Sequence, residues 1–295
     1  MRFASFTAGG PATWGLLSGD YLHDLGPSGS GFAPTLRLAL ARGDLASADP
    51  GAAPRVPVSE VTWLPVIPDP VKIICVGVNY RMHQVETGRD AASAPTLFVR
   101  FADSQTGHDC DVAIPPVVRD FDYEGELAVV VGRELYRTPA AEADDGIAGY
   151  GIYNDFTARD WQRAASQWTP GKNFPGTGAF GPWLVTPDEA GPVSELELWT
   201  RVNGEVRQHA SVSDLIFGIP ALVEYVTSFT RLAPGDVIVT GTPGGVGQFM
   251  RPPALLADGD IVEVSITGLG VLRNRITAGS PGRSATAPAV TSIAS

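Results

Sequence analysis

The chain of 295 residues is poor in cysteine, in basic charge and in long apolar runs. The spacing of its two cysteines, Cys75 and Cys110, matches no common zinc pattern, so we expect neither a disulfide framework nor a zinc site. Cys75 lies in the apolar segment 71–76 and is expected to be a core thiol. With 21 basic against 32 acidic residues the net charge is −11, which argues against a nucleic-acid partner because phosphate binding requires a basic surface.

Membrane and secretion signals are also missing. No uninterrupted apolar run approaches ~18 residues, and the N-terminus lacks the apolar core of a signal peptide. We therefore expect a cytoplasmic protein without a membrane span. Hydrophobic residues at 44% and charged residues at 18% are typical of a soluble globular enzyme. The 34 glycines and 25 prolines indicate many turns and short strands rather than a helical bundle.

Composition divides the chain into three predicted parts. Residues 1–60 form a small N-terminal domain that closes with a Pro-, Gly- and Ala-rich linker at 46–58. Residues 61–278 form a strand-rich catalytic domain. Residues 279–295 are rich in Ser, Ala and Pro and are predicted to be a disordered tail.

Local patterns predict many strands and few helices. The residue pair Asn203-Gly204 is a strong signal for a tight hairpin. Pro220 suits the first position of a helix, and Thr157 is predicted to cap another. The predicted strands are 1–7, 13–17, 71–78, 127–131, 197–202, 205–208, 236–240, 261–266 and 271–276, and the predicted helices are 35–41, 157–165 and 220–229.

Two glutamates, Glu124 and Glu126, stand at positions i and i+2 of a predicted strand. Side chains alternate between the faces of a strand, so both carboxylates point the same way, with Cα atoms about 6–7 Å apart. The two charges repel at that separation, and a hard divalent cation between them would remove the repulsion. A solvated strand face is the alternative, but the apolar residues downstream and the small Gly125 favour a metal site.

Asp155 ends another predicted strand and would supply a third oxygen ligand, with helix capping as the alternative. An oxygen-only ligand set suits Mg²⁺ or Mn²⁺, and Ca²⁺ is also possible. Mg²⁺ prefers about six ligands, so about three positions would stay open for water and substrate. Open positions of this kind distinguish a catalytic metal from a structural one.

Other segments could act beside such a metal. His83 and Glu86 are three residues apart, so on a helix they would form a general-base pair, with an exposed histidine beside an acid as the alternative. Lys172 could hold a substrate carboxylate or a developing oxyanion, although a lone lysine is usually a surface charge. The glycine-rich loop 241–247 is not a Walker A loop, and its N–H groups and the Thr242 hydroxyl either receive an anion or form a plain turn.

Seven motifs make the chain resemble the fumarylacetoacetate hydrolase family across roughly residues 70–276. Each motif alone is weak evidence, but seven in the family's order are specific. They are Asn79-Tyr80-Arg81 with His83 and Glu86, Asp122-Tyr123-Glu124-Gly125-Glu126, Asn154-Asp155-Phe156-Thr157-Ala158-Arg159-Asp160, Gln167-Trp168-Thr169-Pro170-Gly171-Lys172, Gly181-Pro182-Trp183-Leu184-Val185, Val202-Asn203-Gly204-Glu205, and Pro234-Gly235-Asp236 through Gly247.

The resemblance implies a mixed α+β, strand-rich fold, in which a β-sandwich roll of the family's type carries a small N-terminal α+β domain. It also implies a homodimer, bound Mg²⁺ or Mn²⁺ and a small 2-oxo or dioxo acid as substrate. The site residues that it implies are Glu124, Glu126 and Asp155 for the metal, His83 and Glu86 on a lid with Lys172 for catalysis, and Arg81, Gln162, Lys172 and Thr242 for the substrate.

Two positions depart from the family's pattern. Met82 precedes His83 where the family often has Asp, and Pro175 follows Phe174 where the family often has Asp. Both lie near the expected pocket, so the resemblance does not identify the substrate's tail.

We therefore expect a metal-dependent hydrolase that cleaves a C–C bond of a 2,4-dioxo acid, of the acylpyruvate or fumarylpyruvate type known from aromatic catabolism. In this hypothesis His83, oriented by Glu86, draws a proton from the attacking water, and Lys172 stabilises negative charge. The alternatives are a decarboxylase, hydratase or isomerase of an oxaloacetate-type 2-oxo acid, and a non-catalytic binding protein with a structural Ca²⁺.

Overall fold

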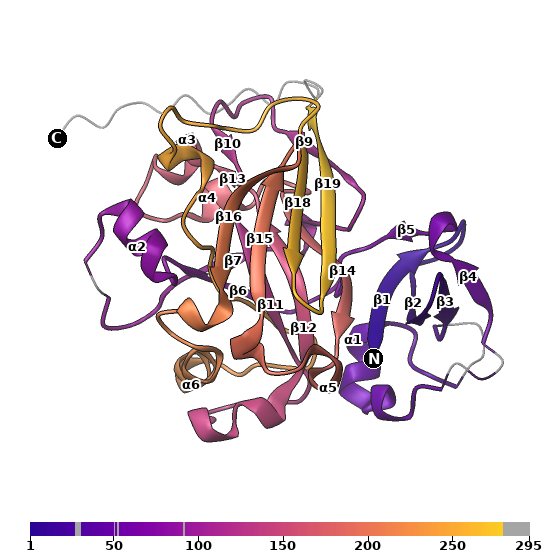
Figure 1. Cartoon of the computed structure of the whole chain (residues 1–295). Coiled ribbons are helices and arrows are strands. Elements are labelled where there is room, and N and C mark those ends of the chain that lie inside the picture. Colours follow the sequence, from indigo (N-terminus) through magenta and orange to yellow (C-terminus); the bar gives the residue numbers. More distant parts are fainter. Residues whose placement is uncertain (27–30, 50, 52, 91, 280–295) are drawn as a thin grey trace.

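Two β-sheets organise the chain, seen here in a computed structural model that describes all residues except 27–30, 50, 52, 91 and 280–295 (Figure 1). The predicted tail therefore lies almost wholly outside the described residues. The large sheet has twelve strands, which are β1 (Arg2–Thr7), β2 (Thr13–Ser18), β3 (Tyr21–Asp24), β4 (Arg55–Pro57), β5 (Thr62–Trp63), β6 (Ile73–Gly77), β7 (Thr96–Arg100), β8 (Gln105–Thr106), β11 (Gly125–Val131), β12 (Ile147–Asp155), β14 (Gly178–Val185) and β17 (Val237–Val239).

The large sheet runs in the order β4-β3-β2-β1-β14-β12-β11-β17-β6-β7, with β5 paired to β1 and β8 to β14. The pairing of β1 with β14 makes the N-terminal unit continuous with the main sheet. A second sheet has the order β16-β15-β18-β19-β9. Its strands are β9 (Asp111–Ile114), β15 (Glu197–Val202), β16 (Glu205–Ser211), β18 (Ile261–Ile266) and β19 (Gly270–Ala278), and a separate two-stranded pair joins β10 (Phe121–Asp122) to β13 (Thr157–Ala158).

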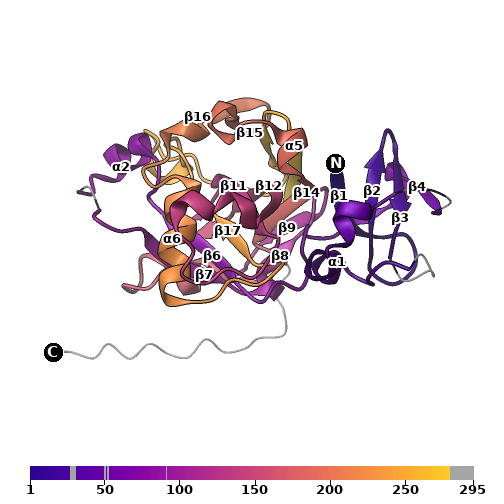
Figure 2. The ribbon, with the colours of Figure 1, turned by 90° about the horizontal axis from the view of Figure 1, so that it is seen from below.

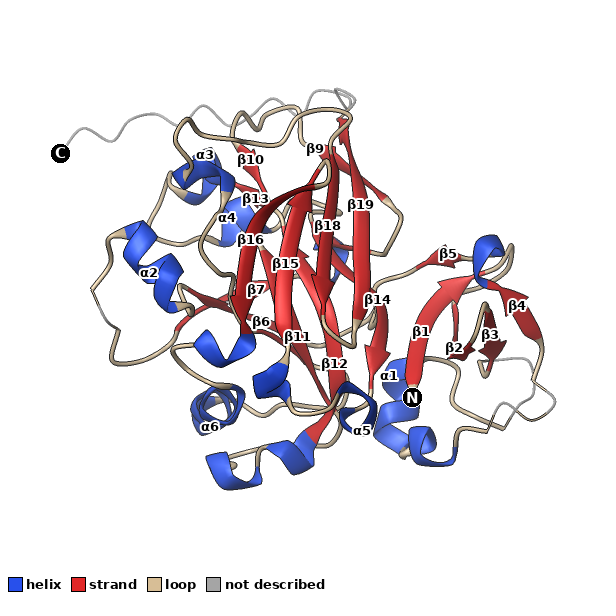
Figure 3. Cartoon of the chain, in the orientation of Figure 1, coloured by secondary structure: helices blue, strands red, loops and turns tan. Residues whose placement is uncertain are grey.

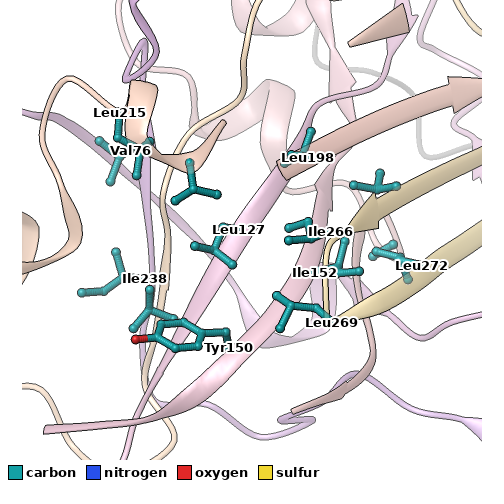
Figure 4. Close-up of a cluster of buried hydrophobic side chains, with 14 of the residues drawn as sticks. Val76, Leu127, Tyr150, Ile152, Leu198, Leu215, Ile238, Ile266, Leu269 and Leu272 are labelled. Carbon is teal, nitrogen blue, oxygen red and sulfur yellow. The ribbon is translucent and has the colours of Figure 1, made fainter. Parts of the chain in front are cut away.

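The five-stranded sheet packs against the centre of the large sheet, with the main apolar core between them (Figures 3 and 4). Leu127 and Ile152 of the large sheet face Leu198 and Ile266 of the smaller one (Figure 4). Gly125 lies where the two sheets approach closely, because a Cβ atom there would stand 2.2 Å from Oγ1 of Thr200 in β15. The expected strand-rich, mixed α+β fold is confirmed.

Short helices surround the sheets. Helix α6 is confirmed with Pro220 in its first turn, and α1 ends at Gly43, whose φ of 76° suits a left-handed C-cap. Two segments differ from expectation. Thr157 caps no helix, because it pairs with Asp122 in an extended strand, and the predicted linker contains β4, which pairs with β3. The helices are α1 (Leu36–Arg42), α2 (Arg81–Thr87), α3 (Arg159–Gln162), α4 (Thr169–Lys172), α5 (Pro187–Ala190) and α6 (Ile219–Phe229).

The N-terminal strands and helix α2 lie at opposite sides of the molecule in both views (Figures 1 and 2). Within the described residues, we find no helix with the length and apolar character required to cross a bilayer.

Candidate active site

Three carboxylates from two adjacent strands converge in the interior. Glu126 belongs to β11, Glu124 directly precedes that strand, and Asp155 ends β12. The antiparallel register brings them together, and the Asp155 N–H donates to the Glu124 carbonyl oxygen at 2.8 Å. The three residues are at most 6% exposed, and each offers an oxygen within 4.8 Å of those of the other two. The acids that the sequence singled out therefore form one cluster.

One lysine and two arginines surround this cluster. Lys172 Nζ donates to Glu124 Oε2 at 2.6 Å and to Asp155 Oδ2 at 2.5 Å. Arg100 Nε donates to Asp155 Oδ1, and Arg159 Nη1 donates to Glu124 Oε1, both at 2.5 Å. All three cations are at most 2% exposed, so each depends on its carboxylate partner to offset the loss of hydration.

These charges move the pKa values of the two glutamates in opposite directions. Burial opposes ionisation of Glu124, but Lys172 and Arg159 outweigh it and lower its pKa to about 2. Burial, together with the negative charges of Asp155 and Glu124, raises the pKa of Glu126 well above its usual range. Burial also opposes the charged form of Lys172, yet Asp155 and Glu124 raise its pKa. Glu126 thus bears the repulsion that a divalent cation would relieve.

The glycine-rich loop 241–247 supports the site through the protein's own carboxylates. The Gly241 N–H donates to Glu126 Oε2 at 2.5 Å, and the Gly245 N–H donates to Glu86 Oε1 at 3.0 Å. The sequence left open whether this loop receives an anion or forms a plain turn, and in the structure these two N–H groups bind carboxylates of the protein itself.

Thr242 and Asp122 fix the same loop. The Thr242 hydroxyl donates to the Gly125 carbonyl oxygen at 3.0 Å and accepts from Gln208 Nε2 at 2.8 Å. Asp122 Oδ1 accepts from the Gly247 N–H at 2.8 Å. The Thr242 hydroxyl thus makes hydrogen bonds within the protein that fix the loop beside the strand of Glu126.

The predicted contact between His83 and Glu86 is formed on α2. His83 Nδ1 lies 2.8 Å from Glu86 Oε2, and the His83 ring is 6.2 Å from that of Phe249. His83 is 5% exposed, although its helix packs loosely, as its neighbours Met82 and Val85 show with 68% and 75% exposure. The carboxylate on Nδ1 leaves Nε2 as the nitrogen available to a substrate.

A cavity of about 420 Å³ joins these groups. Arg81, predicted to bind substrate, is exposed on α2 and is not among the described residues that line this cavity. Asp155 lies beneath its surface with 0% exposure. The predicted site residues that do line it are His83, Glu124, Glu126, Gln162, Lys172 and Thr242.

Sequence reasoning missed three charged residues that hold the site. Arg159 bridges Glu124 and Asp122, and Arg100 holds Asp155. Asp122 and Arg159 stand inside motifs already singled out, so proximity to those motifs was an available signal. No local signal marks Arg100, because its partner is 55 positions away in the chain.

The donor set fits a hard divalent cation. It consists of carboxylate oxygens alone, and such oxygens suit Mg²⁺ and Mn²⁺. Counting Asp122 with the cluster, four carboxylates face three cations, so one negative charge is in excess when all are ionised. A divalent ion would turn this into one positive charge, which favours an anionic substrate.

The sequence of the chain matches a known protein family. A sequence profile described as fumarylacetoacetate (FAA) hydrolase C-terminal matches residues 72–277, which is more than half of the chain. The chain belongs to the fumarylacetoacetate hydrolase family. This is a family of enzymes, and the resemblance seen in the sequence motifs is confirmed.

Relatives of known name within the family include tautomerases and a hydrolase. The chain is 40% identical over 225 residues to human oxaloacetate tautomerase FAHD2A, mitochondrial, covering 76% of this chain and 72% of that protein. It is 43% identical over 223 residues to oxaloacetate tautomerase YisK of Bacillus subtilis, covering 74% of each. The crystal structure of maleylpyruvate hydrolase from Sphingobium sp. SYK-6 in complex with manganese(II) ion and pyruvate matches with a TM-score of 0.78 at 27% identity, covering 95% of this chain and 100% of that one.

Proposed function

We propose that this protein is a divalent-metal-dependent tautomerase that interconverts the enol and oxo forms of a short 2-oxo acid of the oxaloacetate type. The observation that carries the proposal is the placement of a histidine–carboxylate pair and a buried lysine around one cluster of three carboxylates. Tautomerisation needs two things, a proton carrier at C3 and stabilisation of negative charge on the 2-oxo oxygen.

A divalent ion held by Glu124, Glu126 and Asp155 would supply a Lewis acid for the carboxylate and 2-oxo group of the substrate. Lys172 lies beside the same oxygens and places an ammonium group where negative charge develops. Arg159 lines the cavity, and its buried Nη2 has no hydrogen-bond partner among the described residues. This donor is suited to the substrate's carboxylate.

His83 moves the proton. Its Nδ1 is held by Glu86, so Nε2 accepts a proton from, or returns it to, C3 of the substrate. Glu86 in turn accepts from the Gly245 N–H, which fixes the pair to the loop beside the metal cluster. The half-buried position of Glu86, at 20% side-chain exposure, keeps its charge next to the imidazole.

The test follows the disappearance of enol oxaloacetate by its ultraviolet absorbance in a buffer that does not catalyse the reaction. The purified protein with Mg²⁺ or Mn²⁺ should accelerate this step above the spontaneous rate, and a chelator should abolish the acceleration. No acceleration with either metal would refute the proposal.

Hydrolysis of a 2,4-dioxo acid is the second candidate, supported by the likeness to maleylpyruvate hydrolase. The same pair, His83 and Glu86, could draw a proton from an attacking water. Pyruvate release from acylpyruvates, without acceleration of oxaloacetate tautomerisation, would favour this reaction instead. Pyruvate released from oxaloacetate itself would identify decarboxylation.

A further inference from the structure

One wall of the cavity is an aromatic surface that begins at the catalytic lysine. Lys172 Nζ lies 5.1 Å from the ring centroid of Phe98, and the Phe98 ring meets that of Trp168 edge to face at 5.5 Å. Gly77 passes beneath Trp168 so closely that a Cβ atom there would stand 2.0 Å from Cζ3 of the indole. The absence of a side chain at Gly77 thus leaves room for the indole in this wall.

Arg89 stands on this wall. Its guanidinium carbon is 5.0 Å from the ring centroid of Trp168, and both residues line the cavity. A cation stacked on an indole face is attracted by the ring, and its N–H donors, which lie in the plane of the guanidinium, stay available. Arg89 forms no ion pair with any carboxylate in the part of the chain that the structure describes.

The other arginines of the cavity differ in this respect. Arg159 donates to Glu124 and Asp122, and Arg163 donates to Asp120 Oδ2 at 2.6 Å. Their charge is balanced by the protein itself. Arg89 therefore supplies a positive charge at the cavity that nothing in the described residues neutralises, and stacking on Trp168 already restricts its position.

We propose that Arg89, held against Trp168, binds a second carboxylate at the end of the substrate remote from its 2-oxo acid group. This inference rests on the proposed function and specifies its substrate class as short 2-oxo dicarboxylic acids. The cavity of about 420 Å³ lies toward the small end of ligand sites, which span roughly 300–1,000 Å³, so the second carboxylate is only a few bonds from the first.

The position of Arg89 also links recognition to catalysis. It follows Gly88, the C-cap of α2, and stands three residues beyond Glu86. A carboxylate bound to Arg89 would therefore anchor the segment that carries His83 over the substrate. Substrates that lack this carboxylate lose both the contact and the anchoring. Their KM should therefore be higher and their kcat lower than those of substrates that carry it.

The first experiment compares Arg89→Gln with the wild-type enzyme on two substrates, oxaloacetate and its 4-methyl ester, which lacks only the distal charge. Loss of a charge-assisted contact should lower kcat/KM for oxaloacetate roughly 10- to 100-fold and affect the ester far less. Arg89→Lys, which keeps the charge but not the planar stacking, should recover part of the loss. Arg231→Gln is the matched control, because Arg231 also stacks on a ring, that of Tyr136 at 4.4 Å, and does not line this cavity.

An equal loss on both substrates would show that Arg89 only supports the lid, and no loss on oxaloacetate would show that no subsite exists there. Either result overturns the proposal. Trp168→Leu removes the stacking surface while retaining Arg89. Like Arg89→Gln, it should reduce the preference of the enzyme for oxaloacetate over the ester.

A binding experiment separates this inference from the proposed function. Malate and lactate share a 2-hydroxy acid group, and malate alone carries a second carboxylate. Calorimetric titration of the Mn²⁺-loaded protein should show that malate binds more tightly than lactate. Arg89→Gln should abolish this difference by weakening the binding of malate, and the affinity for lactate should stay unchanged. This outcome supports the subsite even if oxaloacetate is not turned over, whereas equal binding of malate and lactate to the wild-type protein refutes it.

Discussion

Two of the walls of the cavity are built in opposite ways. The floor consists of buried side chains in and around the carboxylate cluster, and we define it as Arg100, Glu124, Glu126, Asp155, Arg159 and Lys172. Residues 81–89, which we propose to act as a lid and refer to by that name, rest on a seven-residue helix in which only His83 is buried. The floor holds its groups through several charged hydrogen bonds at 2.5–2.6 Å, and the lid is tied to the glycine-rich loop through Glu86 at 3.0 Å.

This contrast assigns different tasks to the two walls. Fixed charges in a buried site lose little energy to reorganisation when substrate charge develops, so the floor suits metal binding and electrostatic stabilisation. A segment with few buried apolar contacts opens at little expense of free energy, so the lid suits substrate entry and proton transfer. Substitutions in the floor should therefore disturb metal binding or folding, and those in the lid should disturb turnover or substrate binding.

The largest effect is expected for Glu124→Gln. The change preserves shape but removes a ligand charge and leaves Lys172 and Arg159 with a weaker partner. Metal binding measured by calorimetry should be lost, and turnover should fall roughly 10³-fold or more, since a metal contributes several kcal/mol and each 1.36 kcal/mol is tenfold. A variant that stays active without metal would contradict the assignment of the floor.

His83→Ala tests the lid. Loss of a general acid–base group should lower kcat roughly 10²- to 10⁴-fold, while Mn²⁺ affinity stays at its wild-type value. Val85→Ser on the same helix is the matched control, because Val85 is 75% exposed and the change should alter stability by no more than about 0.5 kcal/mol. Normal turnover by His83→Ala would place the proton carrier elsewhere.

Arg100→Met tests whether a substitution in the floor lowers the stability of the protein more than one in the lid. Arg100→Met removes one of the two cations that contact the buried Asp155 and leaves Lys172 as the other, which should lower the free energy of unfolding by about 3–5 kcal/mol. Urea denaturation of the metal-free protein measures this change, and Arg100→Lys should be affected less because it keeps the charge. The contrast between the walls fails if His83→Ala is as destabilising as Arg100→Met.

The smallest effect is expected in the pH dependence of the stability of the metal-free protein, to which Glu126 contributes. Because its pKa is raised in the folded state, that state binds more protons than the unfolded chain, and stability falls as pH rises above about 4.5. Glu126→Gln cannot ionise, so its melting temperature at pH 7 in a chelator should exceed that of the wild type, by roughly 2–4 °C for each kcal/mol recovered. The gain should shrink at pH 5. A melting temperature below that of the wild type at both pH values would show that Glu126 is not under this repulsion.

Local patterns were sufficient where an element depends on its own residues. The hairpin at Asn203-Gly204 is found with φ of 52° and 82° at its two turn residues, as its sequence predicts. Thr157 was misjudged because its side chain is equally suited to cap a helix, while its actual state depends on pairing with Asp122. The same applies to β4, which is held by β3 rather than by its own proline-rich sequence.

The sequence by itself determined the family, the strand-rich fold and the residue types of the site. The reason is that the motifs and the alternation of residues along a strand depend only on residues that are close together in the chain. Only the tertiary structure decided which charges meet. Arg100 reaches Asp155 across 55 positions, Lys172 reaches Glu124 across 48, and Arg89 stacks on Trp168 from another segment. The physical reason is that the strength of a charge pair depends on distance and burial, and both are set by how the strands and the lid pack.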